Sequence, residues 1–520
     1  MELAKDRRDD IECRQDEAGE NVHAQPASKV VASALCGPGS FSSPLGNAYW
    51  VALLLVAVAI ITPIWPVGYP GMVDYPNHLT RCYILAHFHD NPVWQTRYYV
   101  DREPLPNLAI DLIVVPLNHF LPIALSGKIF LTLTALLYVL GCAWLGYAVT
   151  AKRSWVALIA AFTFHNSTLL FGFVNYVFGV GVFLCGFAFW MQSRHRMSWL
   201  RFSICCLFSL AAFLAHLSAI VFLGVGCTTI ALLELRSHRS ALVLIRQLAW
   251  LACPIIAMAG FLKGSGKVGR VGWSTLTKKF ILLFIPVRSY SLTLDVIVLA
   301  ILAGCVLLMA RRARIHSVWV VGLVMFVLFL ITPNELFLGS ALDARYVLPA
   351  TLLLLLSVDP RWDCLQKLAF GIALFVMVLH TADIAWNWVA IDRRQQHVLA
   401  LGAELPNDAR VFVMPYSAVR TPGKLDRGFH NLVTLWTISH EADVSSLFSL
   451  AGQQPLVARH PPLCLDDQWM ECVGHYDFIL TDNPTPATEK LVRSVADQSA
   501  AWDSVTLWRI RHSSRDHPQN

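Results

Sequence analysis

The stretch YWVALLLVAVAIITPIWPVGYPGMVDYPNHL, residues 49–79, decides the fold. It begins with an uninterrupted apolar run, and a helix that crosses a bilayer needs roughly 20 mostly apolar residues. A polar segment follows directly, and Asp74 is its first acidic residue. The stretch therefore predicts a transmembrane helix followed by an acidic segment at the membrane surface.

The rest of the chain has the same apolar character. Of its 520 residues, 56% are hydrophobic and 15% are charged, against about 25% charged in an ordinary soluble protein. The mean hydropathy is +0.52. This composition excludes a disordered chain, a coiled coil and a typical soluble enzyme. Apolar spans occur near 48–66, 123–150, 155–171, 175–191, 199–215, 217–234, 241–262, 293–310, 316–332, 345–358 and 366–388. The sequence predicts a polytopic α-helical membrane protein with about eleven transmembrane helices.

Charged residues divide the chain into three regions. Residues 1–47 are polar, cannot bury enough apolar surface to fold, and are predicted to be a disordered cytoplasmic segment. Residues 48–388 form the predicted transmembrane module, with a long first outer loop at 67–122. Residues 389–520 carry 12 basic and 15 acidic residues and predict a small soluble α/β domain. Its expected strands are near 411–416, 476–481 and 504–510, and its expected helix is near 485–496.

Lysine and arginine are sorted to one side of the predicted membrane. If the N-terminus is cytoplasmic, all the short basic loops face the cytoplasm, while the turns near 172–174 and 215–217 carry no Lys or Arg. Eleven helices then leave the C-terminal domain outside the cytoplasm. There, Cys464 and Cys472 share one soluble stretch, so a disulfide and two free thiols are both open. The net charge of +6 comes from membrane-flanking cations, so a bilayer partner is expected and a nucleic-acid partner is not.

The outer segments carry most of the remaining charge. In the first loop, the spacing from His78 to His89 and from Asn107 to His119 predicts two helices lying on the outer membrane surface. A second loop, 263–292, has six cations and no acid, which suits an anionic headgroup or a phosphate. A third holds Glu335, Asp343 and Arg345.

This layout and two short motifs resemble the GT-C glycosyltransferase superfold, which includes the aminoarabinose transferases of lipid A and the protein O-mannosyltransferases. The segment VDYPNHL, residues 73–79, is similar to the acidic motif in the first outer loop of that group. The segment DARYVLP, residues 343–349, looks like the R-Y-x-x-P element that opens a late helix in many members. The resemblance covers roughly residues 48–388.

The resemblance implies a membrane glycosyltransferase of the bacterial inner membrane, with its C-terminal domain in the periplasm. Its donor would be a polyprenyl-phosphate-linked sugar, and its acceptor a glycan, a lipid or a protein at the extracytoplasmic face. The acceptor hydroxyl must lose a proton, so a general base is required. Asp74 is the candidate base; a role in helix capping or in the loop is the alternative.

Further residues are candidates for the same site. His78 follows Asp74 by four positions and shares its helix face, so it is expected to tune Asp74 or to bind the acceptor, and Asp111 is a second candidate acid. Donor phosphate binding is expected from Arg345, Tyr346, Lys263, Lys267, Arg270 and Lys279, with contact to lipid headgroups as the alternative. Cavity positions are expected at His216, Asn175, Glu335 and Asp343. For His216, capping of a helix at that turn is an equal alternative.

No cofactor is expected. A divalent metal is compatible with this chemistry, but the histidines at 87 and 89 lack a third ligand with supporting spacing. Two other functions remain open. A transporter of lipid-linked glycans would show repeats and acids at the bilayer midplane, whereas here the ionisable residues collect at the outer helix ends. A non-catalytic assembly factor of envelope polysaccharide synthesis would tolerate replacement of Asp74.

Overall fold

The computed structural model describes residues 44–102, 105–238, 241–254, 271–336, 339–414, 429–459 and 469–511. The described residues from 48 onward form one compact unit. Three of the expected phosphate-binding cations, Lys263, Lys267 and Arg270, lie outside the described residues, as do Cys464 and the N-terminal residues up to 43.

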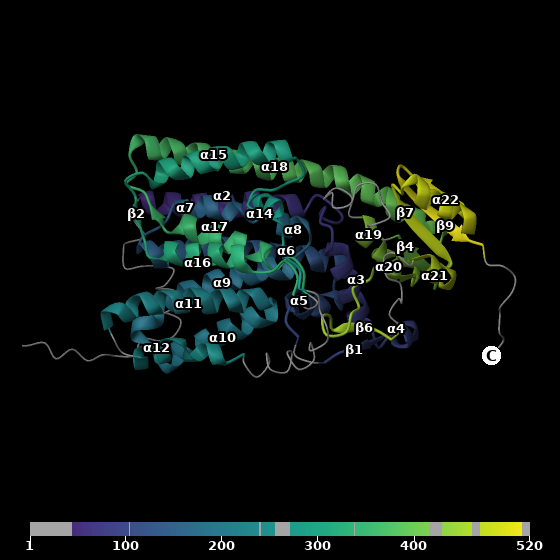
Figure 1. The fold of residues 1–520 in the computed structure, drawn as a ribbon, viewed down its shortest axis with the longest axis horizontal. Coiled ribbons are helices and arrows are strands. Elements are labelled where there is room, and N and C mark those ends of the chain that lie inside the picture. Colours follow the sequence, from purple (N-terminus) through teal and green to yellow (C-terminus); the bar gives the residue numbers. More distant parts are fainter. Residues whose placement is uncertain are drawn as a thin grey trace, which may run out of the picture. The chain divides into compact units, whose positions relative to one another are not determined.

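The structure is mostly helical. Within the described residues, six helices are long and apolar enough to cross a membrane. They are α2 (Pro44–Ile61), α6 (Ile123–Thr150), α9 (Val174–Ser193), α11 (Leu217–His238), α15 (Leu292–Ala310) and α18 (Cys364–Ala400). Shorter helices occupy the other expected spans: α7 (Val156–Phe162) with α8 (Ser167–Leu170), α10 (Trp199–Ala215), α12 (Ala241–Leu248), α16 (Val318–Ile331) and α17 (Val347–Leu356). Figure 1 shows these helices running side by side.

Helix α9 is the most enclosed of the long helices. It packs against α6, α10 and α11, and nearly all of its side chains are buried. Glycines bring α9 close to α6, because a Cβ at Gly141 would lie 2.8 Å from the Leu184 Cβ, and one at Gly181 would lie 2.9 Å from the Leu137 Cγ. Small residues at such contacts are typical of helix packing in membranes. Close packing on nearly all sides therefore fixes the position of α9 and of the residues at its ends.

Leucine and phenylalanine side chains are exposed on the outer helices. Leu54 of α2, Leu307 of α15 and Phe375 of α18 are each more than 60% exposed. Soluble proteins rarely expose extended apolar surface of this kind, whereas lipid tails cover it without cost. These faces indicate a membrane-embedded protein.

The basic loops meet at one end of the helical part. Strand β2 (Arg314–Ile315) pairs with β3 (Val358–Asp359), and Lys152 Nζ lies 2.8 Å from the Asp359 Oδ1. The Arg153 guanidinium lies 5.8 Å from the ring centroid of Trp50, near the start of α2. Loops that the positive-inside rule assigns to one side of the membrane are thus neighbours in the structure.

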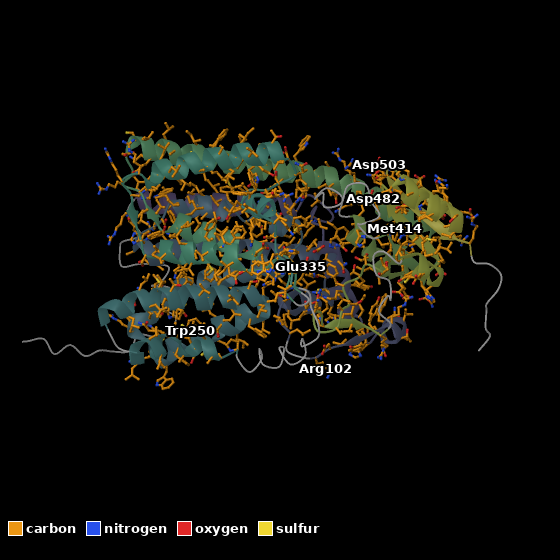
Figure 2. The ribbon with its side chains drawn as sticks, viewed as in Figure 1. Arg102, Trp250, Glu335, Met414, Asp482 and Asp503 are labelled. Carbon is orange, nitrogen blue, oxygen red and sulfur yellow. The ribbon has the colours of Figure 1, made fainter. Side chains whose placement is uncertain are left out.

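A five-stranded sheet lies at the opposite end (Figure 1). Its order is β5 (Asp443–Val444), β4 (Arg410–Val413), β7 (Phe478–Asp482), β9 (Val505–Ile510) and β8 (Ala496–Trp502). Strand β4 is parallel to both β5 and β7, while β9 is antiparallel to both β7 and β8. Helix α22 (Pro486–Val495) buries Val492 in a core with Ile479 and Trp508. The expected strands and the expected helix all occur here, within a few residues of their predicted positions. In the view of Figure 2, Asp482 and Asp503 mark this sheet and Trp250 marks the helical part.

The first outer loop contains α3 (Tyr75–Ala86), α4 (Pro92–Arg97) and α5 (Ala109–Asn118). Helix α3 was expected to lie on the membrane surface, but protein encloses it: nine of its residues are buried. It packs against α5 and α6 on one side. On the other it packs against α19 (Phe429–Leu432), η8 (Val433–Leu435) and α20 (Trp436–His440). Helix α21 (Trp469–Cys472) places Trp469 in the core that contains Val492, Ile479 and Trp508.

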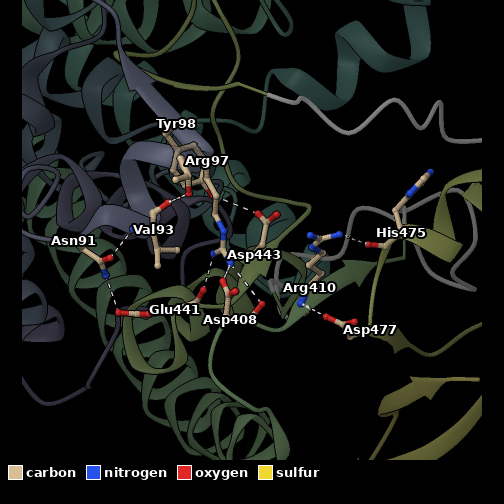
Figure 3. Close-up of polar contacts among 11 residues, drawn as sticks. Asn91, Val93, Arg97, Tyr98, Asp408, Arg410, Glu441, Asp443, His475 and Asp477 are labelled. Atoms are coloured by element: carbon tan, nitrogen blue, oxygen red, sulfur yellow. Dashed lines mark hydrogen bonds and ion pairs between the residues drawn. The ribbon is translucent and has the colours of Figure 1, made fainter. Parts of the chain in front are cut away.

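Strand β1 (Tyr98–Val100), which follows α4, pairs with β6 (Leu456–Ala458). The Arg97 guanidinium donates a 2.6 Å hydrogen bond to the Glu441 backbone oxygen and forms an ion pair with Asp408 (Figure 3). Asn91 donates a 2.7 Å hydrogen bond to the Glu441 carboxylate. The first outer loop is therefore fastened to the C-terminal part of the chain at several points.

Candidate active site

Asp74 lies at the start of α3, in the N-cap position. Its backbone N–H donates to the Phe171 oxygen at 3.0 Å, and its Oδ1 accepts a 2.7 Å hydrogen bond from the Asn431 amide. Its side chain makes no capping bond to α3. Among the described residues, Oδ2 has no hydrogen-bonding partner. One carboxylate oxygen is held and the other is left for a ligand.

The environment of Asp74 changes its proton affinity. Burial raises the pKa of Asp74 to about 7, and the hydrogen bond from Asn431 acts in the opposite direction. An ordinary aspartate has a pKa of about 3.9. A carboxylate with a pKa near the working pH is well suited to accept a proton as a general base.

Gly172 makes the position of Asp74 possible. Its φ angle is +93°, and a Cβ at this position would lie 2.6 Å from the Asp74 nitrogen. A side chain would both strain the backbone and collide with a main-chain atom that cannot swing away. The turn between α8 and α9 can therefore touch the start of α3 only with glycine here.

His78 lies one helical turn after Asp74 and touches the same turn. Its ring hydrogen-bonds the backbone of Gly172 and packs edge-on against Phe448, with ring centroids 5.6 Å apart. Its Nδ1 is buried and has no hydrogen-bonding partner among the described residues. Burial keeps the pKa of His78 well below its usual range, so the ring is neutral at pH 7.

The N-terminal end of α9 gathers further predicted residues. Asn175 accepts a 2.8 Å hydrogen bond from the Ile110 N–H and donates to the Asn107 oxygen, so it anchors the start of α5. The Tyr176 hydroxyl donates a 2.7 Å hydrogen bond to the Arg345 backbone oxygen. Residues 171–176 thus contact the segments that carry Asp74, His78 and Arg345.

Arg345 lies in the short helix η4 (Ala344–Tyr346), directly before α17. Its Nη2 donates a 3.1 Å hydrogen bond to the Ser340 oxygen, while its buried Nε has no partner among the described residues. Tyr346 packs edge-on against Phe222, with ring centroids 5.5 Å apart. The guanidinium therefore retains donor capacity for an anion, beside a fixed aromatic ring.

His216 separates α10 from α11. Its Nδ1 accepts a 3.0 Å hydrogen bond from the Ser218 N–H, and its ring lies 5.5 Å from the ring of Tyr176. The first contact is that of a helix cap, the alternative that the sequence left open. The ring contact with Tyr176 places His216 beside the residue that hydrogen-bonds the Arg345 backbone.

Asp111 lies in a different environment. Its two oxygens accept from the Arg81 Nε at 2.9 Å and from the Arg81 Nη2 at 2.8 Å. Arg81 is fully buried and also donates to Gln454. A carboxylate held in this two-pronged pair has the geometry of a structural ion pair. Its predicted role as a second acid remains a prediction.

Lys279 and Asp343 are brought together, but as partners of each other. The Lys279 Nζ lies 2.9 Å from the Asp343 Oδ2 and donates to the backbone oxygens of Phe329 and Thr332. Lys279 therefore has one ion-pair partner and two backbone acceptors within the protein. Glu335, labelled in Figure 2, is exposed, and its backbone pairs with that of Gly272.

Two residues of this site, Asn431 and Asn77, were not predicted from the sequence. Asn431, in α19, is more than 350 positions from Asp74 in the chain. Asn77, one position before His78, donates a 3.0 Å hydrogen bond to the Asn431 Oδ1. Asn77 lies within the segment 73–79 but was not assigned a role, and only the folded chain brings Asn431 to Asp74. In the described part of the chain, no group of three or more His, Cys, Asp or Glu residues could hold a metal ion.

No protein-family model matches the chain, and no curated protein matches it. A solved structure does: ArnT from Cupriavidus metallidurans in the apo state. The two have a TM-score of 0.53 and 11% sequence identity, over 90% of this chain and 98% of that one. The chain has the fold of ArnT. The resemblance to the GT-C superfold, to which the aminoarabinose transferases of lipid A belong, is therefore confirmed at the level of the fold.

The likeness to ArnT covers most of the chain, 90% of its length. At 11% identity it concerns the fold alone.

Proposed function

We propose that the protein is a GT-C membrane glycosyltransferase that moves a sugar from a polyprenyl-phosphate donor to an acceptor at the extracytoplasmic face. The observation that carries the proposal is Asp74. It is a half-buried carboxylate with one oxygen held by Asn431 and a pKa of about 7. The ArnT fold supports the same class of reaction.

The proposed reaction uses Asp74 as the base and the polyprenyl phosphate as the leaving group. The acceptor hydroxyl gives its proton to the Asp74 Oδ2 while its oxygen bonds to the anomeric carbon of the sugar. The bond from that carbon to the phosphate oxygen breaks, and the electron pair leaves with the polyprenyl phosphate. Single displacement inverts the anomeric centre. Proton transfer to a positioned base contributes about 10²–10⁴-fold to the rate.

Arg345 is the proposed partner of the donor phosphate. Its unpartnered Nε supports this role, because a guanidinium matches the oxygens of a phosphate in a two-pronged geometry. Lys263, Lys267 and Arg270 are proposed to add cations from the preceding loop. Lys279 is a weaker candidate, since it is already paired with Asp343 and donates to two carbonyl groups.

The proposed topology has eleven spans, with a cytoplasmic N-terminus and a periplasmic C-terminal domain in a bacterial inner membrane. The meeting of Lys152, Asp359 and Arg153 near the start of α2 supports it, because these residues belong to loops on the side with positive charge. Asp74 and the C-terminal sheet then share the outer side. A donor headgroup in the outer leaflet would lie at that level.

Glycan profiling of the host envelope tests this function. Cells in which the Asp74→Asn variant replaces the wild-type protein are expected to lose the glycan that cells lacking the protein lose. Thr80→Val, a buried change on the same helix that leaves Asp74 untouched, is the matched control. An Asp74→Asn strain with an unchanged glycan would favour a non-catalytic assembly factor.

A further inference from the structure

Asn431 and Asp74 meet across an interface between distant parts of the chain. The Asn431 side chain is 4% exposed, and its Nδ2 donates to the Asp74 Oδ1 at 2.7 Å. Asn431 lies in α19, among segments that pack against α3. Asn431 therefore belongs to the C-terminal part of the chain and directly contacts the proposed catalytic carboxylate.

A second asparagine fixes which end of the Asn431 amide faces Asp74. Asn77 is fully buried; its Oδ1 accepts from the Phe448 N–H at 2.7 Å and its Nδ2 donates to the Ser446 oxygen at 2.6 Å. Backbone groups cannot exchange donor and acceptor roles, so they set the orientation of the Asn77 amide. Its Nδ2 then donates to the Asn431 Oδ1 at 3.0 Å, which leaves the Asn431 Nδ2 to face Asp74.

We infer that Asn431 is a positioning residue for Asp74: its oriented amide holds one carboxylate oxygen and stabilises the ionised form, while the other oxygen stays available to the acceptor. The inference rests on the proposed function, in which Asp74 is the general base. A donor aimed at Oδ1 fixes the direction of the free oxygen. It also offsets part of the cost of burying the charge.

The other ionisable groups on the surrounding elements leave this role to Asn431. The acidic and basic side chains there are His78 and Arg81 on α3, Asp111 on α5, Lys128 on α6, His430 on α19 and His440 on α20. Arg81 and Asp111 neutralise each other. Burial lowers the pKa of His78 well below its usual range and that of His430 to about 4, so both are neutral near pH 7. Lys128 contacts the Trp65 oxygen and His440 contacts Ser439.

Infrared difference spectroscopy on the purified full-length protein tests the inference without requiring sugar transfer. The band of the protonated carboxyl group is assigned to Asp74 by its loss in Asp74→Asn, and its titration midpoint is expected near pH 7. In Asn431→Ala the midpoint is expected to rise by about one to two pH units, as loss of a hydrogen bond to a charged group predicts.

Two further variants isolate the effect. Asn431→Asp is nearly isosteric and keeps the bond from Asn77, but it places a second carboxyl oxygen against Asp74. The two acids then share a proton, and the upper midpoint of the pair is expected to rise at least as far. Thr80→Val removes the 3.1 Å contact between the Thr80 and Thr434 hydroxyls in the same interface, and its midpoint is expected to match the wild type.

The outcomes separate the inference from the proposed function. A midpoint unchanged in both Asn431 variants overturns the inference, and so does an equal rise in Thr80→Val, which would mark a general effect of the interface. If the midpoint rises as expected while Asp74→Asn leaves the envelope glycan intact, the control of Asp74 by Asn431 stands and the proposed function fails.

Discussion

The Lys279 ammonium lies 2.9 Å from the Asp343 carboxylate, in a pair in which Lys279 is 9% and Asp343 0% exposed at the side chain. The pair joins α14 (Leu276–Leu282) to the segment that precedes Arg345. Both residues were expected to face a ligand, Lys279 as a phosphate contact and Asp343 in a cavity. Their contacts with each other hold the loop that carries Arg345, and both predicted roles remain predictions.

Lys279→Met should therefore lower stability, because it leaves the Asp343 charge buried without a partner. Breaking a buried pair costs about 3–5 kcal/mol. The double variant Lys279→Met/Asp343→Asn should regain most of the loss, since it removes both charges and keeps the Asp343 side-chain contact to the Ala344 N–H. Melting temperatures in detergent measure the loss of stability and its recovery. Breaking the exposed ion pair of Glu489 and Arg493 is the control. If Lys279→Met weakened polyprenyl-phosphate binding at an unchanged melting temperature, the phosphate role would be supported instead.

Asp111→Asn tests whether the pair with Arg81 is structural. Because Arg81 is fully buried, loss of its counter-charge should lower the melting temperature to about the extent that Arg81→Met does, and the two changes should couple by roughly 0.5–3 kcal/mol in a double-mutant cycle. Sugar transfer by the remaining folded protein should keep the wild-type pH profile. A stable Asp111→Asn protein with no transfer would show that Asp111 is a catalytic acid.

The raised pKa of Asp74 predicts how stability depends on pH. The folded protein binds this proton more tightly than the unfolded chain does, since the pKa is about 7 in the fold and about 3.9 without it. The stabilisation is complete below about pH 4 and is lost as the pH rises through 7. Asp74→Asn cannot ionise, so its melting temperature should exceed that of the wild type at pH 8. The difference should shrink toward pH 5, and a constant difference would contradict the raised pKa.

Gly172→Ala should disable the site without touching a catalytic group. The added Cβ would meet the Asp74 nitrogen at 2.6 Å, at a φ of +93°, so the start of α3 must move. Misplacing a catalytic group by about 1 Å can cost about 10²-fold in rate. Gly224→Ala on α11 meets no atom within 4 Å and should leave both transfer and stability intact. Equal activity in the two variants would show that the contact with Gly172 is dispensable.

The membrane helices could be predicted because their signal is local. An apolar run identifies a span by its length alone, and the spans expected at 123–150 and 199–215 coincide with α6 and α10. The strands near 411–416 and 504–510 were also readable, since their apolar residues come in short runs. The enclosure of α3 by protein could not be predicted, because a helix with one apolar face can bind either lipid or protein. Its place at the membrane surface stays a prediction. Residues 429–440, which cover α3, carry no signal of that contact.

The candidate site was predictable only in part, for a related reason. A carboxylate just past the first span, such as Asp74, stands out in a chain with few charges. Asn431 and Asn77 do not stand out, because neutral amides carry no charge pattern and their partners lie far away in the chain. Lys279 and Asp343 were each recognised as unusual, but the sequence could not reveal that they bind each other.

A structure of the protein in a lipid nanodisc with polyprenyl phosphate tests the central claim most directly. The account predicts that the phosphate contacts the Arg345 guanidinium and that the Asp74 carboxylate faces the space beside it, where the acceptor would lie. Binding should weaken in Arg345→Ala. A phosphate held away from both Asp74 and Arg345, with affinity unchanged in Arg345→Ala, would contradict the account.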